Sequence, residues 1–108
     1  MTDREIRGIF EGASDFEART LTAAGCTVYG YFIDGLVSSN YVSEYIYRPI
    51  SDNLTGSSGE AYRRALHGAI YNAVARPCED ADTVAKMLVN GFCVVLFSGV
   101  GAIAFETK

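Results

Sequence analysis

The longest uncharged stretch of the chain runs from Met87 to Phe105, and it limits the fold more than any other feature. It is close in length to the ~20 apolar residues that a membrane-spanning helix needs. Asn90-Gly91 and Ser98-Gly99 interrupt it, however, and the runs between and after these breaks read CVVLF and AIAF, rich in strand-forming residues. The pattern therefore predicts a buried β-hairpin of residues 92–97 and 101–106, and not a membrane span.

The N-terminal half of the sequence predicts one short helix, two strands and a second helix. Apolar residues at helical spacing indicate the first helix over residues 3–11, and strand patterns follow at 16–21 and 26–33. Ser38 or Ser39 can accept a hydrogen bond from the first turn of the next helix, and Pro49 is expected to end it. The face of this helix that we expect to be apolar carries Tyr41, Val42, Tyr45 and Ile46.

The C-terminal half begins with residues 51–59, which read as a loop within the domain. Paired apolar residues every four positions predict a helix from Ala61, and the segment 69–75 could continue it or form a short edge strand before Pro77. Acidic residues at 79, 80 and 82 open the last helix, and its predicted core stripe consists of Ala81, Val84, Ala85 and Leu88. Together these elements predict an α/β (α+β) fold, with a small mixed β-sheet packed by helices and a C-terminal β-hairpin.

Composition indicates a single domain over residues 1–108. The chain has 49% apolar residues and thirteen Tyr and Phe, enough for a core without disulfides. Nine Lys and Arg against thirteen Asp and Glu, with a net charge of −4, disfavour nucleic-acid binding. The three cysteines, Cys26, Cys78 and Cys93, form no C-x-x-C pair, so we expect mostly buried thiols in a reducing compartment. The N-terminus lacks the apolar core of a signal peptide.

No combination of residues supports catalysis or a cofactor. His67 is the single histidine and has no ligand or nucleophile at a matching spacing, so we expect an ordinary helix residue. Glu79, Asp80 and Asp82 could hold a cation, but their place at a helix start accounts for them by capping. Gly99-Val100-Gly101 is interpreted as a turn, because a dinucleotide fingerprint needs a third glycine and a following helix. We therefore expect no enzyme activity, no metal and no cofactor.

Candidate interaction residues come from the tyrosines and from one strand. Tyr41, Tyr45 and Tyr47 could line a ligand groove or a partner surface, since tyrosine combines a large apolar face with a polar tip. Helical spacing favours core packing for Tyr41 and Tyr45. Asp15 and Arg19, four residues apart in an extended segment, lie on one face and could help to define an exposed edge, or they are ordinary surface charges.

Four stretches, taken in order, resemble the N-terminal soluble region of the A subunit of GerA-type spore germinant receptors. They are Ser14-Asp15-Phe16 with Arg19; the strand 28–37, which ends in Asp-Gly-Leu-Val; the helix from Tyr41 that leads to Arg48-Pro49-Ile50; and the helix–Asn-Gly–strand hairpin over 85–99. The resemblance spans about residues 14–106. One departure is Ser98, which stands where the family commonly has an Asp before the turn glycine, a change that suits a turn equally well.

This resemblance implies a non-enzymatic domain in a membrane receptor complex that triggers germination in response to nutrients. Its partners would be B- and C-type receptor subunits and the remainder of its own chain, with self-association as a further expectation. The parent would lie in the spore inner membrane with this domain on the cytoplasmic, spore-core side. Because family members continue into a second subdomain and membrane helices, the chain is expected to be a first subdomain. The alternative is an α/β domain that binds a small ligand, an amino acid or a sugar.

Overall fold

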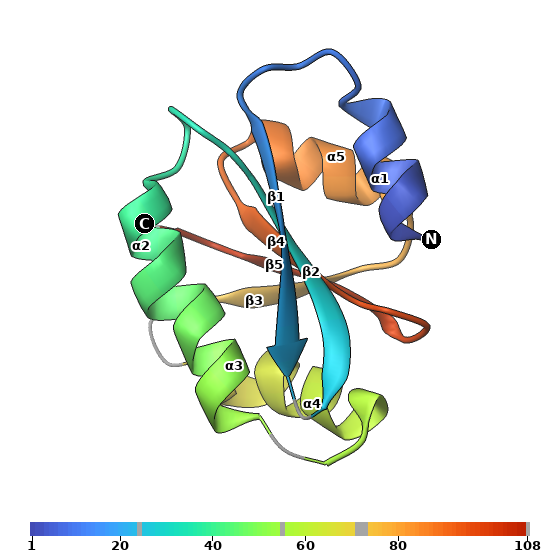
Figure 1. The fold of residues 1–108 in the computed structure, drawn as a ribbon, viewed down its shortest axis with the longest axis vertical. Coiled ribbons are helices and arrows are strands. Elements are labelled where there is room, and N and C mark those ends of the chain that lie inside the picture. The colour runs from blue at the N-terminus through green and yellow to red at the C-terminus, as the bar shows by residue number, and fades with distance from the viewer. Residues whose placement is uncertain (24, 55, 71–73, 108) are drawn as a thin grey trace.

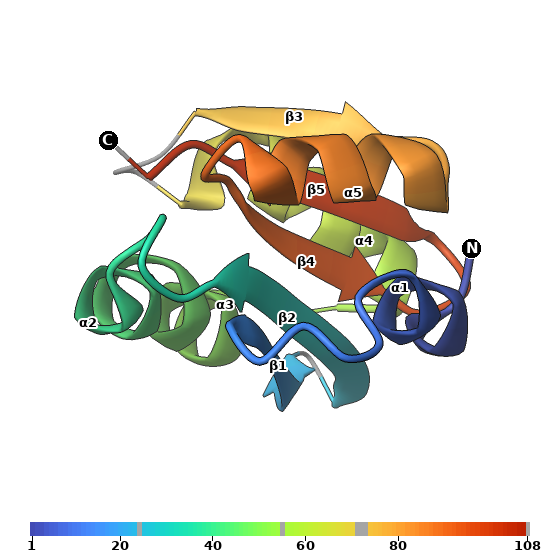
Figure 2. The ribbon, with the colours of Figure 1, turned by 90° about the horizontal axis from the view of Figure 1, so that it is seen from above.

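The computed structural model describes residues 1–23, 25–54, 56–70 and 74–107. Its centre is a five-stranded sheet with the strand order β1-β2-β4-β5-β3. Figure 2 shows this order from β3 at the top to β1 at the bottom. The strands are β1 (Phe16–Ala23), β2 (Cys26–Ile33), β3 (Ala75–Cys78), β4 (Cys93–Phe97) and β5 (Gly101–Phe105).

Helices cover both faces of the sheet, which gives a three-layer arrangement (Figure 1). One face is covered by α1 and α5, and the other by the continuous run α2–η1–α3 together with α4 and η2, where η marks a π-helical turn. The bounds are α1 (Asp3–Ile9), α2 (Ser39–Val42), η1 (Ser43–Tyr47), α3 (Arg48–Asn53), α4 (Ser58–Arg64), η2 (Ala65–Ala69) and α5 (Ala81–Val89). We call the first the α1/α5 face and the second the α2–α4 face.

The alternation of side chains along each strand divides the core into two clusters. In β4, Cys93, Val95 and Phe97 point to the α2–α4 face, and Val94 and Leu96 point to the α1/α5 face. All five are at most 1% exposed, because β4 is a central strand between two helical layers. A strand buried on both sides reads as a continuous apolar run, and this explains why the CVVLF segment resembled part of a membrane span.

The C-terminal half confirms several sequence predictions. The uncharged stretch forms the end of α5 and the antiparallel hairpin β4–β5, and the described residues contain no helix long and apolar enough to cross a membrane. Val84 and Leu88 are fully buried in the predicted α5 stripe. Asp80 caps α5 by accepting a hydrogen bond from the Thr83 N–H at 2.8 Å. Gly91 follows the helix with φ 85°, the left-handed conformation expected there.

The prediction that Pro49 ends its helix is wrong. The helix starts as expected at Ser38, whose Oγ accepts from the Tyr41 N–H, but it runs through Pro49 to Asn53. Proline normally breaks a helix because it lacks an N–H and clashes with the carbonyl four residues back. Here the π turn η1 lies just before it, and the Arg48 N–H donates to the Ser43 carbonyl five residues back. This wider turn displaces the backbone and lets Pro49 occupy the first turn of α3.

Two other details differ from expectation. The predicted loop 51–59 is shorter, because α3 extends to Asn53, Leu54 is buried and α4 begins at Ser58 with a Ser57–Glu60 capping box.

The sheet is antiparallel at every strand pairing and not mixed. A helical crossover carries the chain from β2 to the far edge at β3, where the strand direction reverses. The return through α5 leads to β4, which runs in the same direction as β3, with β5 between them. The predicted fold class, helices against a small sheet with a C-terminal hairpin, is confirmed.

The segment 69–75 could not be assigned from sequence. Residues 71–73 lie outside the described part of the chain, and the strand β3 begins at Ala75. Contrary to the expectation of a strand that stops before Pro77, β3 includes it. The Glu106 N–H donates to the Val74 carbonyl, so alternate residues of β3 face β5 and the Pro77 nitrogen faces outward. Proline is tolerated there because no ladder hydrogen bond is lost.

Candidate functional site

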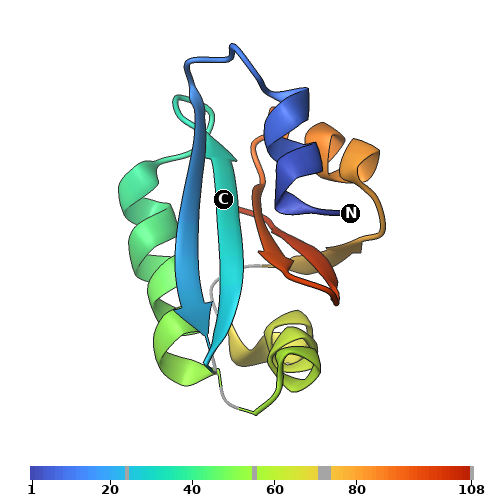
Figure 3. The same cartoon turned by 45° about the vertical axis from the view of Figure 1, so that its right-hand side comes forward.

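A polar cavity lies between the β1 edge of the sheet and the helical run α2–η1, the layers seen side by side in Figure 3. Its volume is about 330 Å³. Its walls combine one cation, two carboxylates, two hydroxyls and two aromatic rings, contributed by Glu17, Ala18, Arg19, Phe32, Asp34, Ser39, Ser43 and Tyr47. The volume is in the range of small-molecule sites, which begin at about 300 Å³.

Tyr47 lines this cavity from the π turn η1. It is 3% exposed, although helical periodicity places it away from the face of Val42 and Ile46. The π turn η1 explains this, because an extra residue per turn brings Tyr47 to the inner side. Its ring lies over Gly30 of β2, and a Cβ at that glycine would be 2.3 Å from a ring carbon. Gly30 is therefore required for this close packing.

The Tyr47 hydroxyl is buried, and it has no hydrogen-bond partner in the described part of the chain. The Cys93 thiol lies against this hydroxyl and makes a weak hydrogen-bonding contact with it, since sulfur is a poor hydrogen-bond partner, but the geometry falls short of a regular hydrogen bond. Burial raises the pKa of the Tyr47 hydroxyl, and it raises the pKa of the Cys93 thiol to about 12. Both groups are therefore neutral at physiological pH. An orphaned buried hydroxyl costs stability and calls for an explanation.

Arg19 covers the Tyr47 ring from the solvent side. Its Cζ lies 5.9 Å from the ring centroid, within cation–π range. Among the described residues, neither Glu17 nor Asp34 lies within 4.0 Å of its guanidinium, since the ion pairs of the chain are formed elsewhere. The guanidinium N–H groups of Arg19 can therefore donate to a ligand, and the two carboxylates of the cavity can accept from one.

The structure brings together two of the five residues proposed from sequence. Arg19 and Tyr47 meet in the cavity, whereas Asp15 is exposed just before β1, where its carbonyl accepts from the Asp34 N–H at 2.8 Å. Tyr41 and Tyr45 contact each other with ring centroids 4.9 Å apart. Tyr41 packs partly against the core, but Tyr45 is 46% exposed, so core packing is wrong for Tyr45.

Sequence reasoning missed most of the cavity wall. Glu17, Asp34, Ser39 and Ser43 were not proposed as site residues, because each is an ordinary polar residue in its local context. Strict alternation along β1 places Glu17 and Arg19 on the same face, so that pair could have been found. The serines belong to the capping turn and first π turn, and no pattern in the sequence indicates their proximity to β1.

The other candidates do not converge. His67 is exposed at the end of η2, where the backbone leaves helical geometry, and Asp80 serves as the α5 cap. The hydrogen bonds from Thr83 lower the pKa of the Asp80 carboxyl. Across the described ranges, no group of three or more His, Cys, Asp or Glu side chains could hold a metal ion. Cys78 and Cys93 are buried and Cys26 is half-buried.

A second cavity of about 460 Å³ lies at the turn between β4 and β5. It contains none of the five interaction residues proposed from sequence, and its charged groups are Glu79 and the Met1 ammonium. The Met1 ammonium is already 3.6 Å from Glu5. The Arg19–Tyr47 cavity is therefore the better candidate site.

Comparison with known proteins gives one informative result. No protein-family model matches the chain, and no curated protein does. Among solved structures, it is similar to the N-terminal domain of the A subunit of the Bacillus megaterium spore germinant receptor GerK3. The TM-score is 0.63 over 97% of this chain and 88% of that chain, at 15% sequence identity.

The chain has the fold of that receptor domain. The resemblance stated on the four sequence stretches is thus confirmed at the level of the fold, which covers nearly the whole chain. At 15% identity the similarity concerns the architecture.

Proposed function

We propose that this chain is a domain of a spore germinant receptor A subunit and takes part in nutrient-triggered germination without catalysing a reaction. The observation that supports this is the shared fold over 97% of the chain. The order and spacing of the four sequence stretches support it independently. They span about residues 14–106 and correspond in order to β1, β2, the α2–α3 run and the α5–β4 segment.

In this proposal the domain corresponds to residues 1–108 as a first subdomain, with further segments of its own subunit beyond it. Its partners are B- and C-type receptor subunits, and its parent lies in the spore inner membrane with this domain on the cytoplasmic side. The acidic net charge of −4 and the buried cysteines Cys78 and Cys93 are compatible with that placement.

The proposed mechanism is a change of contacts. A receptor relay needs an element with two arrangements of similar free energy, to which both the signal and the response are coupled. The helical run α2–η1–α3 is the best candidate, because it contains the π turn, borders the cavity and buries the unpaired Tyr47 hydroxyl. A signal that offers that hydroxyl a partner would favour a second arrangement of the run.

The test is made in spores of the organism that encodes the chain. A tagged copy is cross-linked in dormant spores, and the captured proteins are identified by mass spectrometry. We expect B- and C-type receptor subunits among them, and we expect deletion spores to lose the response to at least one nutrient in an optical-density germination assay. Unchanged germination across a nutrient panel, together with no receptor subunit captured, would contradict the proposal.

A second candidate function is binding of a small amino acid or sugar, which the Arg19–Tyr47 cavity favours. Arg19 could pair with a ligand carboxylate, and Glu17 and Asp34 could pair with an ammonium group. The hydroxyls of Ser39 and Ser43 would suit a sugar.

This candidate is tested by NMR titration of the purified chain with single amino acids and sugars. Binding is expected to shift the Arg19 and Tyr47 signals, to be lost in Arg19→Gln, and to persist in Arg63→Gln on the exposed side of α4. Absence of shifts across the panel would exclude this function for the isolated domain.

A further inference from the structure

The two edges of the sheet differ in how they are protected. β3, at one edge, has four residues and carries Pro77 with its nitrogen facing outward. Short length and an outward proline are common devices that prevent pairing with another chain. β1, at the other edge, has eight residues and no proline. Figure 2 shows β1 at the end of the sheet, with α2 and α3 to one side and α1 to the other.

The register of the first hairpin identifies which backbone groups of β1 face outward. The Asp34 N–H donates to the Asp15 carbonyl, so odd-numbered residues of β1 bond to β2. The N–H and C=O groups of Ala18, Thr20 and Thr22 therefore point away from β2. The Phe16 N–H also points away and donates to the Ala13 carbonyl at 3.3 Å. In the described part of the chain, β1 pairs with no strand other than β2.

The side chains of β1 suit pairing with an identical strand in one antiparallel register. If Ala18 of one copy lies opposite Ala18 of another, Glu17 lies opposite Arg19 of the other copy, twice across the two-fold axis. The Glu17–Arg19 pair occupies a non-hydrogen-bonded position, where the Cα atoms are about 4.5 Å apart and the side chains are closest. Both side chains are exposed on the same face of β1, so they can reach one another.

Neighbouring registers lack this match. Centring on Glu17 sets the two Glu17 carboxylates opposite each other, although Asp15, just before β1, then faces Arg19. Centring on Arg19 sets two arginines opposite each other, and centring on Phe16 places Asp15 opposite Glu17. Centring on Thr20 leaves Arg19 opposite Leu21. In the Ala18 register, the Ala18 N–H of each copy donates to the Ala18 carbonyl of the other, and the Thr20 N–H donates to the Phe16 carbonyl.

We propose that β1 is a self-association edge, through which two copies of this chain join into one continuous antiparallel sheet with Ala18 on the two-fold axis. The partner is a second copy because Glu17 and Arg19 are complementary to their own reversed order. This inference does not depend on the proposed receptor function, since it is measured on the purified chain alone.

Sedimentation velocity from about 10 µM to about 1 mM, the range in which small interfaces associate, tests the proposal. The chain is expected to shift from monomer to dimer. Glu17→Arg and Arg19→Glu should each weaken dimerisation roughly tenfold, because two attractive cross-strand pairs become repulsive. The double variant E17R/R19E should restore it. Arg63→Glu, which changes the net charge equally on the exposed side of α4, should have no effect.

Two further variants test the edge without changing its charge. Thr20→Pro removes an outward N–H and no bond to β2, so it should abolish the dimer and keep the circular dichroism spectrum. Ala18→Cys should form an intermolecular disulfide faster than Thr20→Cys, because 18 and not 20 lies opposite itself. A monomer at every concentration, a dimer that Thr20→Pro leaves intact, or a double charge reversal that fails to restore a folded dimer would each overturn the proposal.

Discussion

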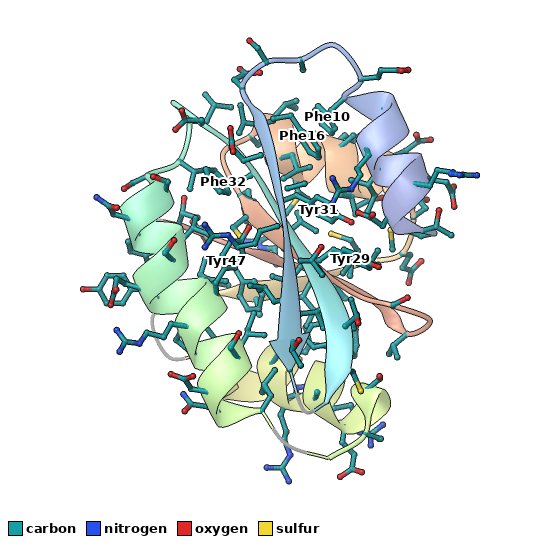
Figure 4. The ribbon with its side chains drawn as sticks, viewed as in Figure 1. Phe10, Phe16, Tyr29, Tyr31, Phe32 and Tyr47 are labelled. Atoms are coloured by element: carbon teal, nitrogen blue, oxygen red, sulfur yellow. The ribbon has the colours of Figure 1, made fainter. Side chains whose placement is uncertain are left out.

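The two faces of the sheet solve the same packing problem in different ways. On the α1/α5 face the buried tyrosine is fully partnered: the Tyr31 hydroxyl donates to Asp3 Oδ1 at 2.6 Å, and Arg7 Nε donates to the same carboxylate at 2.8 Å. Phe10 stacks on Phe16 with centroids 4.7 Å apart. Figure 4 shows Phe10, Phe16 and Tyr31 between the strands and α1.

The α2–α4 face is less regular. Its helices contain two π turns, its tyrosine at position 47 has an unpaired hydroxyl, and its packing depends on a glycine in β2. Figure 4 places Tyr47 on the opposite side of the strands from Tyr31. The cavity lies on this face. The difference indicates that the α1/α5 face mainly stabilises the domain, whereas the α2–α4 face retains costly features that a purely structural layer would not need.

Alkaline pH should give the largest change in the free energy of unfolding, through Cys93 on the α2–α4 face. The pKa of the Cys93 thiol is raised by burial to about 12, whereas an unfolded thiol titrates near about 8.5. The contribution of this thiol should thus be complete below about pH 8.5 and decline as pH rises, with a loss on the order of 3 kcal/mol by pH 11. Urea unfolding from pH 7 to 11 measures this. Cys93→Ala should remove the part of the decline that begins near pH 8.5, while burial, which also raises the pKa values of Tyr31, Tyr47 and Cys78, leaves a remainder. Val95→Ala, on the same strand and face, should lower stability equally at every pH, and identical slopes would contradict the argument.

Glycine substitutions should affect the two faces in opposite directions. Gly30→Ala places a Cβ against the Tyr47 ring and should lower the unfolding free energy by about 1–3 kcal/mol. Gly8→Ala in α1 meets no atom within 4 Å and should raise it by about 0.5–1 kcal/mol. Chemical denaturation of both variants measures the contrast. A Gly30→Ala protein as stable as the parent would show that the Tyr47 ring moves freely.

Removing the buried tyrosine hydroxyl from each face should change the free energy of unfolding in opposite directions. Tyr31→Phe leaves the Asp3 carboxylate without its buried donor and should cost about 1–2 kcal/mol. Tyr47→Phe removes an unpaired hydroxyl from the same kind of environment and should be neutral or stabilising by up to about 1 kcal/mol. Thermal and urea unfolding of the pair test this. If Tyr47→Phe destabilises as much as Tyr31→Phe, the Cys93 contact is a true hydrogen bond.

The smallest change in the free energy of unfolding is expected from substitution of Arg19. Its contact with the Tyr47 ring lies at the surface, so Arg19→Ala should cost less than about 1 kcal/mol. Arg19→Lys should recover part of that loss, since a lysine can also make a cation–π contact. A loss above that limit would indicate that Arg19 makes stronger interactions than the ring contact.

The α1/α5 side of the molecule was the more predictable. Helix 3–11, the strand 26–33, the Asp80 cap, the Val84–Leu88 stripe and the C-terminal hairpin all follow from patterns within a few residues, and the structure confirms them. On the other side of the sheet, Arg19 and Tyr47 are separate interaction candidates in the sequence, and no sequence pattern predicts that they meet in one cavity. Tyr45 was assigned to the core in place of Tyr47 because ideal helical spacing cannot anticipate a π turn.

The sequence by itself determined the type and order of most elements and the resemblance to a germinant-receptor domain. These depend on periodicity, caps and turns, which are local. Only the tertiary structure decided that Pro49 stays within a helix, that Gly30 accommodates Tyr47 and that Glu17, Arg19 and Asp34 line one cavity. It also decided which strands form the edges. Such features depend on which distant segments pack together, and the free energy of that packing overrides local preference.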